Sequence, residues 1–179
     1  MPEPLLIGFF RSSAAYRTRI ALNLKGICAQ YASVHLRKGE QFSESHRRLN
    51  PASLVPVWLE SSDFALSQSL AIIEYLDEKY PEPPLLPVDR KLRAFAREIA
   101  LTVACDIHPL GNLRVLEKLT ADYGADEDER AAWARYYIAI GFDAIEARLA
   151  QTTGRYSIGD APTIADVCLI PQVANARRF

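Results

Sequence analysis

Cysteine is scarce in this chain of 179 residues, and its few cysteines are scattered. Cys28, Cys105 and Cys168 lie far apart and lack metal-ligand spacing such as C-x-x-C, so no metal site is predicted. An odd and sparse set is typical of a reducing cytosol rather than of a disulfide framework. Each cysteine follows an apolar residue, and we expect all three to be small, buried hydrophobic side chains.

An excess of basic residues and long apolar runs are also missing. Lys and Arg number 21 against 22 Asp and Glu, and this balance argues against a nucleic-acid-binding surface. No apolar run reaches the roughly 18 residues that a membrane span needs, and no basic segment precedes an apolar core as in a signal peptide. We therefore expect a soluble, cytoplasmic protein whose partners are small molecules or other protein chains.

The first eighty residues alternate between apolar runs and helical spacing. The predicted strands span residues 5–10, 31–36, 54–59 and 64–67. The predicted helices span residues 16–25, 41–49 and 69–80. This order predicts a small mixed sheet covered by helices, with a parallel first half followed by an antiparallel hairpin.

The first helix is expected to be amphipathic, with apolar and basic side chains on different sides. The apolar side chains are Tyr16, Ile20, Leu22 and Leu24. The basic side chains are Arg17, Arg19 and Lys25. Gly26 ends the pattern.

A stiff, proline-dense connector at 81–87 separates two kinds of sequence. Beyond it the strand signal disappears and helical patterns follow, with a break near Pro109. Thr163 and Asp166 have nearly the spacing of a capping box at the start of the last helix. We predict a sheet-containing domain at 1–81, a linker at 82–88 and an all-helical domain at 89–179, which stops in the middle of a helical face.

The turn Arg11-Ser12-Ser13 is the first candidate site, because it joins a predicted strand to a predicted helix. Unpaired amides and the helix dipole favour an anion at such a place. Hydroxyl donors there would lower the pKa of a bound thiol. The alternative is that Ser12 or Ser13 only caps the helix, which is worth roughly 1 kcal/mol. From this turn alone, capping is the favoured interpretation.

Two further segments could bind an extended ligand. A cis Val55-Pro56 bond would leave the Val55 backbone open to pair with a peptide, although a trans proline that opens a strand is the commoner case. Gln68-Ser69 begins a helix and could hold a carboxylate, with capping again as the alternative.

The helical half contributes fewer candidates. His108, Asn112 and Arg114 lie near the break at Pro109, and Arg178 lies at the far end. Arginine can bind a carboxylate with two hydrogen bonds, although a single arginine is more often a solvated charge. His108 alone is better interpreted as a structural hydrogen-bond partner. The two other histidines, His35 and His46, have no supporting pattern.

Taken together, the motifs resemble those of zeta-class glutathione transferases, a family that includes maleylacetoacetate and maleylpyruvate isomerases. The run 10–22, FRSSAAYRTRIAL, is similar to the family signature. The other matching runs, in order, are 50–51, 54–56, 68–76, 85–87, 107–110, 159–160 and 171–179. The resemblance covers the whole chain.

This resemblance implies a thioredoxin-like N-terminal domain, a helical C-terminal domain, a homodimer and glutathione as cofactor. The implied glutathione-binding residues are Ser12, Ser13, Gln41, Val55, Pro56, Gln68, Ser69, His108 and Asn112. Within this set, Val55 pairs with the cysteinyl backbone, Gln68-Ser69 hold the γ-glutamyl end, and Gln41 reaches the glycyl side. Arg11, Arg114 and Arg178 match positions that face substrate carboxylates.

Two features depart from the family pattern. Ala14 stands where the family usually has cysteine. This replacement leaves the serine donors Ser12 and Ser13 intact. Family members also continue for a few more helices after the Arg-Arg-Phe run, so we expect the helical domain to be incomplete.

The resemblance favours a glutathione-dependent cis–trans isomerase that converts maleylacetoacetate to fumarylacetoacetate, with Ser12, Ser13 and Arg11 as catalytic residues. Maleylpyruvate isomerisation and general glutathione transfer are alternatives within the same class. A non-catalytic binding protein on the same fold is the alternative from another class.

Overall fold

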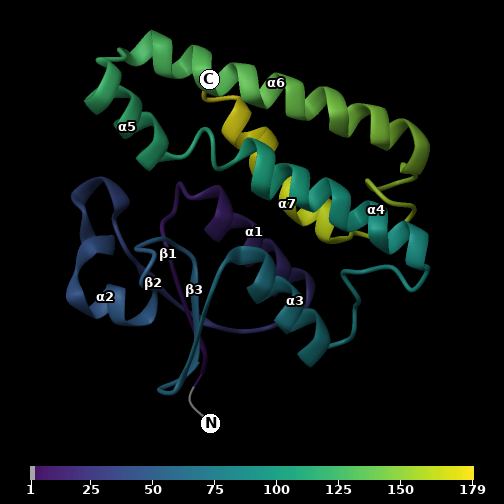
Figure 1. Ribbon diagram of the computed structural model, residues 1–179. Helices are drawn as coiled ribbons and strands as arrows, with labels where there is room; N and C mark the ends of the chain where they lie inside the picture. The colour runs from purple at the N-terminus through teal and green to yellow at the C-terminus, as the bar shows by residue number, and fades with distance from the viewer. Residues whose placement is uncertain (1–2) are drawn as a thin grey trace. The chain divides into compact units, whose positions relative to one another are not determined.

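The computed structural model describes residues 3–179, and the chain divides into two compact units, Met1–Leu85 and Leu86–Phe179 (Figure 1). None of the helices formed by residues 3–179 is long and apolar enough to cross a membrane.

The first unit contains a four-stranded mixed sheet in the order β2-β1-β3-β4. The strands are β1 (Leu5–Gly8), β2 (Gln30–Ser33), β3 (Val57–Ser61) and β4 (Phe64–Ser67). β1 and β2 are parallel, whereas β3 pairs antiparallel with both β1 and β4. The predicted parallel half followed by an antiparallel hairpin is therefore confirmed, although β1 and β2 end earlier than predicted and β3 begins later.

Two helices, α1 (Ser13–Leu24) and α3 (Ser69–Lys79), pack against each other and against the sheet (Figure 1). The buried cluster beneath them is Leu6, Leu22, Trp58, Ile72 and Leu76. Leu6 and Trp58 are directly paired on β1 and β3, so their side chains lie on the same face of the sheet. Burial of each of these side chains contributes about 1.5–3 kcal/mol before entropy is counted.

The predicted basic side of α1 is wrong for two residues, because Arg17 is only 1% exposed and Lys25 only 8%. The Lys25 ammonium is satisfied inside the unit. It donates to the carbonyl oxygens of Tyr80 at 2.6 Å and Pro83 at 2.8 Å and pairs with Asp77 at 2.7 Å. These partners offset the desolvation of its charge, and they hold the end of α3 beside α1.

Between β2 and β3 the chain forms three short helical segments. They are η1 (Leu36–Lys38), η2 (Glu40–Phe42) and α2 (Glu44–Leu49). The single helix predicted at 41–49 is thus two segments, because Ser43 has an extended backbone and caps α2 through its hydroxyl.

The second unit is all-helical, as predicted. Its helices are α4 (Arg90–Leu101), the π-helical segment η3 (Thr102–Ile107), α5 (Leu113–Tyr123), α6 (Glu127–Thr152) and α7 (Ile164–Ala176). α7 packs against α4 and η3 and buries Val167 and Cys168 completely. A Cβ atom at Gly141 of α6 would lie only 2.3 Å from Ile107, so glycine allows α6 to approach η3 closely.

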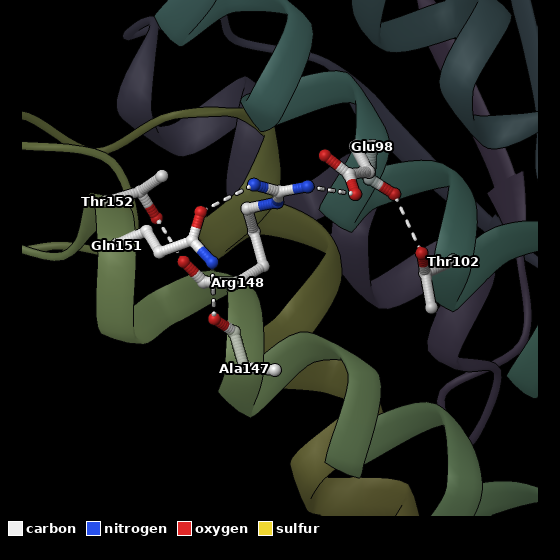
Figure 2. Close-up of polar contacts among 6 residues, drawn as sticks. All are labelled: Glu98, Thr102, Ala147, Arg148, Gln151 and Thr152. Atoms are coloured by element: carbon white, nitrogen blue, oxygen red, sulfur yellow. Dashed lines mark hydrogen bonds and ion pairs between the residues drawn. The ribbon is translucent and has the colours of Figure 1, made fainter.

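Arg148 joins α6 to α4 at the surface of this unit (Figure 2). Its Nη2 donates to Glu98 Oε1 at 2.9 Å and its Nη1 to Gln151 Oε1 at 3.0 Å. The guanidinium also stacks over the Phe95 ring, 4.4 Å from its centroid. Charge and stacking together link the two helices at the surface.

The expectation of three buried cysteines is correct only for Cys168. Cys28 is exposed in the connection that follows α1, and Cys105 is exposed on η3. Apolar sequence neighbours do not bury a side chain when the residue itself lies on the solvent side of its turn or helix.

Candidate functional site

Strand register gathers the candidate segments of the first unit at one edge of the sheet. Val57, at the start of β3, pairs with Ile7 near the end of β1 and with Ser67 at the end of β4. Because β2 runs parallel to β1, its last residue, Ser33, lies beside Gly8 at the same edge. The segments that follow β1, β2 and β4 and the one that precedes β3 therefore meet there.

At the start of α1, Ser12 is the N-cap residue, and its Oγ accepts a hydrogen bond from the Ala15 N–H at 3.2 Å. The predicted capping role is thus confirmed for Ser12. Capping uses a lone pair of the hydroxyl and leaves its hydrogen available to donate. Ser13 is buried in the first turn and Arg11 is exposed. Capping and thiolate stabilisation are therefore compatible at this turn.

The Val55-Pro56 peptide bond is cis, so of the two options left open by the sequence the commoner trans form is wrong here. Val55 is buried. Within residues 3–179, neither its N–H nor its C=O forms a backbone hydrogen bond. Backbone donors and acceptors without partners favour a ligand that can pair with them, and an extended ligand at this edge would pair with both groups of Val55.

The start of α3 differs from the starts of the other α-helices in the described chain. No side chain caps α3, and its N-cap residue, Gln68, has a positive φ of 71°. Ser69, the first helical residue, is buried. The interpretation that this start is simply capped is therefore wrong. Its first N–H groups and the positive end of the helix dipole remain available to an anion.

Gln41 lies in η2, which follows β2 at the same edge of the sheet. Its side chain is only 8% exposed, and its Oε1 has no hydrogen-bond partner among the described residues. An unsatisfied buried amide costs about 1–3 kcal/mol unless a partner is supplied. Gln41 thus adds a second polar group that a ligand would satisfy.

The helical unit places its candidates at two points. His108 follows η3 and is half-buried, and Asn112 caps α5 by accepting from the Arg114 N–H at 3.3 Å. Arg114 is exposed on α5, and Arg178 is exposed just after α7. His108, Asn112 and Arg114 therefore share one segment, whereas Arg178 comes from another.

Sequence reasoning gave no role to His46, which is buried and contacts the Leu54 carbonyl oxygen through Nε2 at 2.9 Å. Its segment is polar, and no periodic pattern marks it as buried. Only the fold of α2 against the loop before β3 reveals this contact.

Known proteins resemble this chain over nearly its whole length. The family described as "Glutathione S-transferase, N-terminal domain" matches residues 11–79. A probable maleylacetoacetate isomerase of Vibrio cholerae is 48% identical, with 100% of this chain and 84% of that protein covered. A maleylpyruvate isomerase of Ralstonia is 51% identical, with 97% and 82% covered.

Solved structures agree with these sequence matches. The crystal structure of a maleylacetoacetate isomerase from Methylobacterium extorquens AM1, with bound malonate and glutathione, matches with a TM-score of 0.93 and 40% identity. The match covers 98% of this chain and 83% of that one.

Fold and matches define the class as the glutathione transferases, with a thioredoxin-like unit followed by a helical one. Within that class, the chain belongs to the zeta family, together with the maleylacetoacetate and maleylpyruvate isomerases.

Proposed function

We propose that this chain is a glutathione-dependent cis–trans isomerase that converts maleylacetoacetate to fumarylacetoacetate in aromatic amino-acid catabolism. The observation that carries the proposal is the sheet edge of the first unit. There an uncapped helix start, a Val55 N–H and C=O without backbone hydrogen bonds and an unsatisfied Gln41 Oε1 come from segments that meet at the same edge as the two serines.

These groups fit the chemistry of glutathione. The γ-glutamyl carboxylate suits the start of α3, where Ser69 offers a hydroxyl as well as helix amides. Val55 offers a donor and an acceptor for the cysteinyl backbone, and Gln41 offers an amide for the glycyl end. We assign further glutathione contacts to Pro56 and Gln68 and, from the helical unit, to His108 and Asn112.

Glutathione, when bound, supplies a thiolate that adds reversibly to the cis double bond and is returned unchanged after rotation. Ser12 and Ser13 stabilise that thiolate by hydroxyl donation and by the dipole of α1, which lowers the thiol pKa. Arg11, Arg114 and Arg178 bind the carboxylates of the substrate and the enolate charge that develops next to its carbonyl. No metal is assigned to this reaction.

Maleylpyruvate is the second candidate substrate, because the Ralstonia relative with that activity in its name is 51% identical. Both compounds carry a maleyl group conjugated to a carbonyl and require the same thiolate addition. We further propose that the protein acts as a cytoplasmic homodimer.

The test is the rate at which each maleyl compound loses absorbance, with and without glutathione. Isomerisation only in the presence of glutathione is the expected result, and the ratio of kcat/KM for the two substrates decides between them. Equal rates with and without glutathione would refute the proposal. Retention on immobilised glutathione without turnover of either compound would instead favour a binding protein.

A further inference from the structure

Two buried side chains converge on the carbonyl oxygen of Leu54. His46 Nε2 lies 2.9 Å from this oxygen, and Asn50 Nδ2 donates to it at 2.8 Å. A carbonyl oxygen only accepts, so Nε2 of His46 carries the proton. His46 is 4% exposed and Asn50 3%, so both donor side chains are held within the fold. The Leu54 carbonyl is therefore held by two donors, one from α2 and one from its C-cap.

The held oxygen belongs to the same peptide group as the Val55 N–H. A trans peptide is planar, with its C=O and N–H pointing in opposite directions. Donors that fix the Leu54 oxygen therefore also fix the direction of the Val55 N–H. They polarise the peptide as well, which makes this N–H a stronger donor.

The backbone just before this peptide has an unfavourable conformation. Ser53 has a φ of 54°, a left-handed conformation that is unfavourable for serine. The Asn50 side chain also accepts from the Ala52 N–H at 3.1 Å, so one residue supports two points of the turn. His46 is the second, independent support, and it comes from the body of α2.

We propose that His46 is a positioning residue for glutathione, which orients the Val55 N–H by holding the Leu54 carbonyl. The inference rests on the proposed function, in which Val55 pairs with the cysteinyl backbone of glutathione. His46 itself does not touch the ligand. Its loss lets the Leu54–Val55 peptide rotate, because Asn50 then holds the oxygen alone.

The test uses variants that separate hydrogen bonding from packing. His46→Phe keeps an aromatic ring and removes the donor, and His46→Leu does the same with a smaller side chain if the ring is not accommodated. His46→Gln restores an N–H donor. Arg48→Ala is the matched control, because it removes an exposed ion pair with Glu44 from the same helix. Each variant is measured for the Val55 amide signal in ¹⁵N–¹H spectra without ligand, the Kd for glutathione, and kcat.

In His46→Phe we expect the Val55 amide signal to move without ligand and the Kd for glutathione to rise roughly five- to tenfold, the loss of about one hydrogen bond. We expect kcat at saturating glutathione to change less than about twofold, since the reacting atoms are untouched. His46→Gln should recover most of the affinity, and Arg48→Ala should change none of these quantities.

Each contrary outcome has a distinct meaning. If the wild-type protein fails to bind glutathione, the proposed function is wrong and this role falls with it. If the wild type binds and the donor-less variants bind equally tightly, only the role of His46 is overturned. Weaker binding with an unmoved Val55 signal also overturns it, because the effect would then arise elsewhere in the fold.

Discussion

The starts of α3 and α7 illustrate two uses of the same helix chemistry. At α7, Thr163 and Asp166 form a capping box, and Asp166 also places a negative charge in the first turn. At α3 no side chain caps the helix, no acidic residue lies in the first turn, and the N-cap residue has a positive φ. The start of α7 is satisfied by the protein itself, whereas the amides and dipole at the start of α3 have no side-chain cap, and the proposed function assigns them to the carboxylate of glutathione. Under the proposed function, the start of α7 contributes stability and the start of α3 contributes binding.

The largest effect is expected at α1, whose start combines both uses. Ser12→Ala together with Ser13→Ala removes both hydroxyl donors, and kcat/KM should fall on the order of 10²-fold, as for loss of a preorganised donor. The stability loss should be only about 1 kcal/mol, the value of one cap. Steady-state kinetics and thermal unfolding of the same samples separate the two effects. An unchanged rate would mean that the thiol lies elsewhere.

Loss of the α7 cap should affect stability alone. Asp166 accepts from the Ser157 N–H at 2.8 Å, the Thr163 N–H at 2.7 Å and the Thr163 hydroxyl at 3.1 Å. Asp166→Ala leaves these donors unsatisfied and should lower the free energy of unfolding by roughly 2 kcal/mol. Asp128→Ala, an exposed first-turn residue of α6, is the control and should cost less than about 0.5 kcal/mol.

The Kd for glutathione should remain that of the wild type in Asp166→Ala under conditions where the variant is folded. A substantial change in Kd without unfolding would break the distinction between the two kinds of helix start.

Relief of the strained N-cap of α3 should raise the free energy of unfolding, in contrast to the loss expected for Asp166→Ala. Gln68→Gly accommodates the positive φ and should raise the free energy of unfolding by about 1 kcal/mol, because the relief of strain exceeds the added unfolded-chain entropy of glycine. The same change removes the Gln68 amide, so glutathione should bind roughly tenfold more weakly. Chemical denaturation and calorimetry measure the two values. A destabilised variant would show that the positive φ costs little here.

The smallest effect concerns Glu60, whose carboxylate accepts hydrogen bonds from Tyr75 at 2.7 Å and from Trp58 at 3.4 Å and pairs with Lys79. Burial raises its pKa, but hydrogen bonds from Lys79, Tyr75 and Trp58 outweigh burial and lower the pKa below its ordinary value of 4.5. Because the pKa of Glu60 is lower in the folded state than in the unfolded chain, its ionised carboxylate stabilises the fold at pH values above the unfolded-state pKa. This stabilisation is lost as the pH falls through the folded-state pKa.

Glu60→Gln should therefore flatten the fall in stability below about pH 4.5 and leave the Kd for glutathione at pH 7 unchanged. Unfolding measured across the acid range, with the wild type in parallel, checks this. An acid limb of the same slope in both proteins would show that Glu60 does not contribute to it.

The sequence predicts the order of elements well, because apolar runs and proline punctuation are local signals. Burial of charged side chains is not local. Lys25 is buried because Asp77 and two carbonyl groups, more than fifty residues away, complete its hydrogen bonds. The cysteines show the same limit of local sequence signals. Their apolar neighbours predict that all three are buried, but only Cys168 is.

The sequence predicts which motifs form the candidate site, but it does not predict that they lie close together. Ser12, Val55 and Ser69 could each be singled out from local chemistry, yet strand register is what brings their segments to one sheet edge. The missing cap of α3 is partly visible in sequence, since glutamine is not a favoured N-cap residue. The positive φ of Gln68 and the hold of His46 on Leu54 are products of the fold.

Titration of the wild-type protein with glutathione, followed in ¹⁵N–¹H spectra, tests the central claim most directly. The account predicts that the amide signals of Val55, Ser69 and the first turn of α3 shift on saturation, while those at the capped start of α7 stay in place. Saturable binding that leaves the start of α3 unshifted, or no binding at all, would contradict it.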